Sequence, residues 1–150
     1  MGEMLEYTYV NGNAYGTTKK SVEEARARGK NVILDVDTIG AMKIRALCPD
    51  ATLVYILPPS WDELKSRLSS TGIYNKEEVN ALMEIAEEEI SCANSYDYIL
   101  VNDTISNTLS RFAQIIHSNR YSRNCMKEFL DSYIDGEVKP HVQSYKEALL

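Results

Sequence analysis

Short apolar runs alternate with longer segments of helical periodicity along this chain. The apolar runs are rich in β-branched and aromatic residues and predict strands over residues 5–10, 32–36, 53–57 and 98–101. The last three lack alternating polar residues, which is typical of parallel strands covered on both faces. Strands that alternate with helices predict an α/β fold, with a parallel central sheet and flanking helices.

The predicted helices have recognisable first residues. A side-chain oxygen stands three residues before a glutamate at Ser21 with Glu24, Ser60 with Glu63, and Asn75 with Glu78. Such pairs bind the free backbone N–H groups of a first helical turn, so we expect helices to begin there. Gly29 is expected to end the first helix, because a C-cap favours a left-handed residue.

The helix after Asn75 is strongly acidic on one side. Its glutamates are Glu77, Glu78, Glu84, Glu87, Glu88 and Glu89, and its apolar stripe is Val79, Leu82, Met83, Ala86 and Ile90. The stripe indicates a core-facing side, and the glutamates indicate a solvated side. A further helix is expected over residues 106–118, with Leu109, Phe112, Ala113 and Ile116 inward, and a short one over residues 125–134.

The composition is that of one globular domain, with 44% hydrophobic and 25% charged residues in a chain of 150. The net charge of −6 lies wholly in residues 76–150, which argues against nucleic-acid binding. Cys48, Cys92 and Cys125 lack zinc-site spacing and are expected to be reduced and partly buried. No segment is long and apolar enough to cross a bilayer and no signal peptide opens the sequence, which predicts a cytoplasmic location.

Two segments near the start carry the main chemical information. Residues 5–17 read LEYTYVNGNAYGT, and residues 33–37 read ILDVD. Together they resemble the GMP-binding half of the guanylate kinase family. Further residues stand in register with family motifs, namely Lys30, Gly40, Pro58, Pro59, Ser60, Val101, Asn102 and Asp103. The resemblance covers about residues 1–118 and implies the fold of P-loop nucleoside monophosphate kinases.

The base of GMP sets the chemistry of the expected site. Guanine presents two neighbouring N–H donors and a carbonyl acceptor, so its selection needs carboxylates and a hydroxyl side by side. Glu6, Thr17 and Asp37 are of those types, and the resemblance implies that they contact the base. It also implies that Tyr15 donates its hydroxyl to the GMP phosphate and that Asp35 lies in the site.

Each of these residues also has a purely structural interpretation. Glu6 could be a surface residue of its strand, and Asp35 could bind a neighbouring loop. Thr17 and Thr18 could cap the helix that follows them. Taken together and in register, the residues favour the GMP site. Gly40, Asn102 and Asp103 are expected to lie beside it.

The sequence departs from the family in the part that handles phosphate. Its 150 residues contain no GxxxxGK[ST] loop, which binds donor phosphates, and the family's two upstream phosphate-binding arginines have no counterpart. In the lid, Arg67 is retained as a candidate catalytic residue. The next family arginine falls on Thr71, and the family's Lys-Arg pair falls on Ala81 and Leu82.

These departures predict an N-terminally truncated domain that begins after the phosphate loop. Residues 1–118 would be a partial domain, with part of the GMP-binding subdomain over 1–30 and the core and lid over 31–118; residues 119–150 would be a partly helical extension. In the family's fold the missing first strand lies between the strands matching residues 32–36 and 53–57. Two apolar edges would then be open to aggregation, strand addition or self-association.

The leading functional hypothesis is a segment that keeps the guanine-reading surface but cannot phosphorylate GMP alone. The family reaction that the resemblance implies is ATP + GMP giving ADP + GDP, with Mg²⁺. For this chain we expect weak GMP binding and no metal, cofactor, nucleic acid or membrane insertion. One alternative is a protein-interaction module like the guanylate kinase-like domains of membrane-associated scaffolds. Another is an incomplete gene model of an active guanylate kinase.

Overall fold

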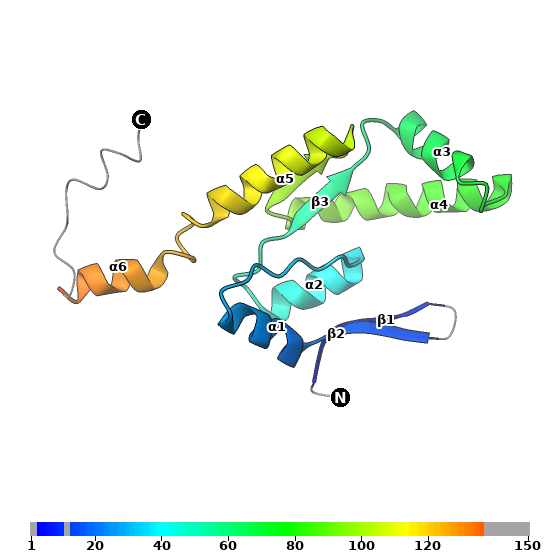
Figure 1. Cartoon of the computed structure of the whole chain (residues 1–150). Helices are drawn as coiled ribbons and strands as arrows, with labels where there is room; N and C mark the ends of the chain where they lie inside the picture. Colours follow the sequence, from blue (N-terminus) through cyan, green and yellow to red (C-terminus); the bar gives the residue numbers. More distant parts are fainter. Residues whose placement is uncertain (1–2, 11–12, 137–150) are drawn as a thin grey trace. The chain divides into compact units, whose positions relative to one another are not determined.

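The computed structural model describes residues 3–10 and 13–136 of the chain (Figure 1). Its internal contacts divide the chain into two compact units, Met1–Ile105 and Ser106–Leu150, and each is taken by itself below. Strands and helices alternate in the first unit, in agreement with the predicted α/β class. Among the described helices none has the length and apolar character needed to span a membrane.

The first unit opens with a β-hairpin, drawn in blue in Figure 1. Strand β1, Met4–Val10, pairs antiparallel with β2, Asn13–Thr18. An irregularity between Met4 and Glu6 sets a register in which Glu6 lies opposite Thr17. Strand β1 confirms the prediction for residues 5–10. The sequence analysis missed β2, because its glycine and asparagine are residues that favour turns.

Helix α1, Lys19–Ala27, begins at a different residue from the predicted one. Thr18 is its N-cap, and the Thr18 hydroxyl accepts a hydrogen bond from the backbone N–H of Ser21 at 3.2 Å. The predicted start at Ser21 with Glu24 is therefore wrong. The predicted end is confirmed, since Gly29 follows the helix with φ 71°, a conformation that glycine adopts without steric cost.

The predicted strand over residues 32–36 is absent. Residues 30–37 belong to no strand, although burial alternates along them as in an extended chain: Val32, Leu34 and Val36 are half-buried, and Ile33 is 64% exposed. Apolar composition makes this segment suitable for a sheet, but a strand also needs a neighbour for its backbone N–H and C=O groups. No described residue supplies that neighbour.

Helix α2, Thr38–Leu47, follows this segment and packs against β1. On α2, Ala41 and Ile44 are buried, with relative exposures of 2% and 5%. The ammonium of Lys43 lies 5.3 Å from the centre of the Tyr7 ring, which adds a cation–π contact between hairpin and helix. The hairpin is therefore held against α2.

Strand β3, Val54–Leu57, pairs in parallel with β4, Tyr98–Val101, as predicted for residues 53–57 and 98–101. The pair is the second two-stranded sheet of the described chain. Arg45 of α2 connects the starts of both strands. Its guanidinium donates one hydrogen bond to Asp97 Oδ2 at 2.5 Å and another to the carbonyl of Ala51 at 2.9 Å. Asp97 also accepts from the backbone N–H that precedes β3.

Two packed helices lie between β3 and β4 in the sequence. Helix α3, Trp61–Ser70, begins at Ser60, and α4, Lys76–Glu89, begins at Asn75 with a complete capping box, so both predicted starts are confirmed. The short 3₁₀ helix η1, Ile90–Ser95, leads on to β4. Along the predicted apolar stripe of α4, Val79 is buried, Leu82, Met83 and Ala86 are half-buried, and Ile90 lies beyond the helix and is exposed.

Few apolar side chains of the described residues are fully covered. The buried ones are Leu5, Ala41, Ile44, Leu53, Val79 and Leu100. On the β3–β4 sheet, Ile56 and Ile99 are half or more exposed. A parallel sheet normally has both faces covered by helices. This sheet therefore exposes apolar side chains that such a sheet would bury.

The second unit holds α6, Lys127–Ile134, and all of α5, Ile105–Asn119, except its first residue. Both helices agree with the predictions for residues 106–118 and 125–134. Neither contains a buried residue, and the predicted inward side chains are unequally covered: Leu109 is 61% exposed, whereas Phe112 and Ile116 are half-buried. The predicted domain division at residue 118 stays a prediction.

Candidate functional site

The hairpin places a carboxylate and a hydroxyl side by side. Glu6 and Thr17 are cross-strand partners, and Thr17 Oγ1 donates to Glu6 Oε1 at 2.9 Å. Glu6 is only 8% exposed, and no described residue forms an ion pair with it. A single hydroxyl compensates little of the cost of burying a carboxylate. The pair therefore has an acceptor oxygen, Glu6 Oε2, that suits an N–H donor.

Asp37 is held at the N-terminus of α2. Its Oδ1 accepts from the backbone N–H of Gly40 at 2.6 Å, as an N-cap does. A β-carbon on Gly40 would lie 3.1 Å from Asp37 Oδ1 and 3.8 Å from Glu6 Oε2. Both carboxylates therefore border the same point, where the positive end of the α2 dipole favours them. The structure brings Glu6, Thr17 and Asp37 together; we call these three residues the carboxylate cluster.

Tyr15 and Asp35 lie next to this cluster in the chain. Tyr15 is two residues before Thr17 in β2, so both side chains are on one face of the hairpin. Its ring is 58% exposed. Asp35 is exposed and stands two residues before Asp37 in the extended segment, on the same side of it. The positions of Tyr15 and Asp35 in the chain therefore place the Tyr15 hydroxyl and the Asp35 carboxylate near the cluster, and both residues are exposed to solvent.

Arg67 is engaged within the protein. Its Nε donates to Glu63 Oε1 at 2.7 Å, and its Nη2 donates to the backbone carbonyls of Asn102 at 3.0 Å and Asp103 at 3.4 Å. These bonds fasten α3 to the end of β4. Asp103 also binds locally, since its Oδ1 accepts from the backbone N–H of Thr104. A catalytic role for Arg67 would require its guanidinium to leave these partners.

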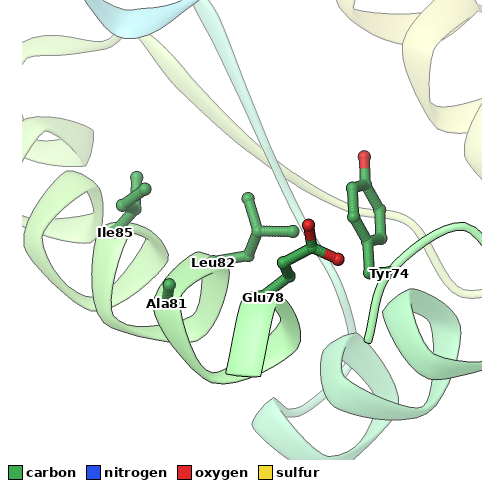
Figure 2. Close-up of a pocket in the computed structure, with 5 residues that line it drawn as sticks. All are labelled: Tyr74, Glu78, Ala81, Leu82 and Ile85. Carbon is green, nitrogen blue, oxygen red and sulfur yellow. The ribbon is translucent and has the colours of Figure 1, made fainter. Parts of the chain in front are cut away.

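A shallow hollow of about 250 Å³ lies on α4 (Figure 2). Glu78, Ala81, Leu82 and Ile85 project from the helix, and Tyr74 faces them from the preceding turn. Glu78 is the only charged residue among them, and its carboxylate binds the backbone N–H of Asn75. The lining is apolar at Ala81 and Leu82, the two positions where the family resemblance places a lysine and an arginine. None of the described residues that line the hollow is a cation.

The comparisons with known proteins point to one family. A family model described as guanylate kinase matches residues 1–119. The chain belongs to the guanylate kinase family. The guanylate kinase of Clostridium acetobutylicum is 38% identical over 142 residues, which cover 94% of this chain and 66% of that protein. The guanylate kinase of Francisella tularensis subsp. tularensis is 44% identical over 116 residues, which cover 77% of this chain and 61% of that protein.

A solved structure shows the same relationship. The crystal structure of guanylate kinase from Anaplasma phagocytophilum aligns with a TM-score of 0.64 and 30% identity, covering 81% of this chain and 58% of that one. The predicted P-loop nucleoside monophosphate kinase class is supported by this neighbour. The chain spans less than two thirds of the length of these guanylate kinases.

Two residues near the cluster, Thr38 and Glu89, were not predicted from the sequence to take part in the site. The Thr38 hydroxyl, next to Asp37, donates to Glu89 Oε1 at 3.1 Å, and the two residues are 51 positions apart. Near them the rings of Tyr55 and Tyr96 make an edge-to-face contact with centroids 4.9 Å apart. Burial raises the pKa of both tyrosine hydroxyls, and the Glu89 carboxylate adds to each rise in pKa. No local sequence motif predicts contacts between residues this distant in the chain.

Two further observations complete the description of the site. Cys48 and Cys92 are free and half-buried, which agrees with the predicted partial burial, whereas Cys125 is free but exposed, so that prediction is wrong for Cys125. Within residues 3–10 and 13–136, no three His, Cys, Asp or Glu side chains are grouped to hold a metal ion. The carboxylate cluster is therefore the part of the described chain with the chemistry of a ligand site.

Proposed function

We propose that this chain binds GMP weakly through its guanine base and does not phosphorylate it unaided. Glu6, Thr17 and Asp37 would receive the base, the Tyr15 hydroxyl would donate to the phosphate, and Asp35 would lie beside them. The reaction of the family, ATP + GMP giving ADP + GDP, would then require groups that these 150 residues do not contain. The observation that carries the proposal is the buried Glu6 carboxylate, which within the described part of the chain is hydrogen-bonded to the Thr17 hydroxyl and borders Gly40 together with Asp37.

The chemistry of the base supports this assignment. Guanine offers N1–H and its amine to neighbouring oxygens, and Glu6 Oε2 and the free oxygen of Asp37 are acceptors of that kind. The Thr17 hydroxyl, whose hydrogen is donated to Glu6, adds an acceptor for an N–H group of the base. Adenine has an acceptor at N1, which two carboxylates would repel. The same cluster therefore favours guanine over adenine.

ATP and Mg²⁺ do not fit the residues present. Phosphoryl transfer depends on positioning and on neutralising the charge of the phosphates. The hollow on α4 offers the carboxylate of Glu78 and no cation, and Arg67 is bound to Glu63 and to backbone carbonyls. Carboxylates repel triphosphates, so the described residues do not form a site for ATP.

Calorimetry with GMP and AMP tests the proposed function. We expect GMP to bind with a dissociation constant near millimolar, about 4 kcal/mol, because the base contacts remain without the phosphate contacts. AMP should bind at least about tenfold more weakly. An assay with ATP, Mg²⁺ and GMP should yield no GDP. Low-micromolar GMP affinity, or GDP formation at an ordinary kinase rate, would contradict the proposal.

One observation favours a second function, that of a protein-interaction module. The hollow on α4 is lined by Tyr74, Leu82 and Ile85, and such apolar surface suits a protein partner better than a nucleotide phosphate. If the partner bound at the proposed GMP site instead, Tyr15→Phe and Asp35→Ala would weaken its capture in a pull-down. A partner captured equally well by both variants would not use that site.

We further propose that the parallel sheet is one strand short beside β3. Among the described residues β3 pairs with β4 alone, residues 30–37 have no strand partner, and Ile33 and Ile56 are exposed. An open apolar edge of this kind takes up strands from other chains. We expect the purified chain to self-associate as its concentration rises, measured by sedimentation velocity. A monomer at all concentrations, with slow amide exchange throughout β3, would contradict this.

A further inference from the structure

A hydrogen bond joins α4 to the N-terminus of α2, beside the base-reading carboxylate. Thr38 is the first residue of α2 and directly follows Asp37, the N-cap. Its hydroxyl donates to Glu89 Oε1 at 3.1 Å, and the bond is partly buried. Glu89 is the last residue of α4. The bond therefore connects two elements that are far apart in sequence, at the point where Asp37 is fixed.

Glu89 stands where a carboxylate is electrostatically unfavourable. The last turn of α4 holds Glu87, Glu88 and Glu89 and no basic residue, and the C-terminus of a helix is its negative end. Burial raises the pKa of the nearby Tyr55 hydroxyl, and the Glu89 carboxylate adds to that rise. In the described chain the hydrogen-bond partner of Glu89 is Thr38. Helix stability alone does not explain a glutamate at this position.

The position of Asp37 depends on the first turn of α2. One carboxylate oxygen is bound to the backbone N–H of Gly40, and the other is left for a ligand. A change in the tilt of this turn would move both the free oxygen of Asp37 and the point that it shares with Glu6. The hydroxyl of Thr38 restrains that turn from the side of α4. Hydrogen bonds to charged acceptors are the stronger kind, so this restraint is an effective one.

We propose that Glu89, acting through Thr38, is a positioning residue that orients Asp37 for guanine and links the hollow-bearing helix α4 to the base site. This inference rests on the proposed GMP site, and it adds a residue that touches no ligand itself. The two ends of α4 then have different tasks. Its first half lines the hollow at Glu78, Ala81 and Leu82, and its last residue holds the first turn of α2.

Amide exchange at Gly40 and GMP titration of the same variants test the proposal. Thr38→Val removes the hydroxyl at nearly constant shape, and Glu89→Ala removes the acceptor. We expect each to speed exchange of the Gly40 N–H and to weaken GMP binding, both about fivefold. Thr38→Ser keeps the hydroxyl and should restore both values. Glu87→Ala removes the same charge from the same exposed turn and should change neither.

The amide of Val79 in α4 serves as the internal reference, since it donates to the carbonyl of Asn75 far from the link. If exchange rises equally at Gly40 and Val79, the bond is merely structural and the proposal is overturned. It is also overturned if Gly40 exchange stays unchanged in Thr38→Val and Glu89→Ala. If the wild-type chain binds no GMP, the proposed function fails, and the ratio of the two exchange rates still decides whether Glu89 positions the α2 turn.

Discussion

Replacing Glu6 by glutamine should remove most of the GMP affinity and leave the fold as stable as before or more stable. Glutamine is nearly isosteric, and its carbonyl can still accept from the Thr17 hydroxyl. Its amide group, however, would face the N–H donors of guanine with donors of its own. Losing a hydrogen bond to a charged acceptor costs about 10- to 100-fold in affinity, which would take millimolar binding below detection.

The stability of this variant should move in the opposite direction. Glu6 is 8% exposed and has the Thr17 hydroxyl but no ion-pair partner among the described residues. Neutralising a buried carboxylate without a cation should stabilise the hairpin unit by about 1 kcal/mol. Urea unfolding and GMP calorimetry on Glu6→Gln measure the two effects. Glu3→Gln, at an exposed carboxylate, is the matched control. A destabilised variant that still binds GMP would contradict the account.

Gly16→Ala should disrupt the hairpin that carries the cluster. A β-carbon on Gly16 would lie 2.3 Å from the carbonyl oxygen of Glu6 and 2.7 Å from the β-carbon of Tyr7. Backbone cannot yield as a flexible side chain does, so β1 and β2 would have to separate. We expect a loss of about 3 kcal/mol in unfolding free energy and no detectable GMP binding, measured by urea unfolding and titration.

Gly72→Ala provides the control for this variant. Gly72 has φ 68° and open space around its α-carbon, so alanine there carries a conformational cost without a clash. That cost is about 1 kcal/mol, and Gly72 lies outside the hairpin. Equal losses of stability in the two variants, or an intact β1–β2 register in Gly16→Ala, would show that the close approach at Gly16 is not what fixes the hairpin.

Local chemistry made some elements of the fold predictable from sequence. The caps at Ser60 and Asn75 and the end of α1 at Gly29 involve residues within one turn of each other, so the pattern of a few neighbours determined them. Strands β3 and β4 were predictable from their apolar runs, although their pairing was not. At α1 two candidate caps lay three residues apart, and composition alone could not choose Thr18 over Ser21.

Other features depend on residues distant in the chain. The apolar segment over residues 32–36 has strand composition, but the structure gives its backbone no neighbour, and composition does not report a missing partner. In the site, the family resemblance identified Glu6, Thr17 and Asp37, which the structure brings together. The bond from Thr38 to Glu89 spans 51 positions and has no sequence pattern that predicts it.

The most direct test of the account is a nuclear magnetic resonance titration of the wild-type chain with GMP, followed at individual backbone amides. The account predicts shifts at Glu6, Thr17 and Gly40 that saturate near millimolar GMP, with little change on adding AMP and none at Tyr74 or Leu82 on α4. Equal shifts with GMP and AMP, or GMP shifts confined to the α4 hollow, would contradict a surviving guanine site.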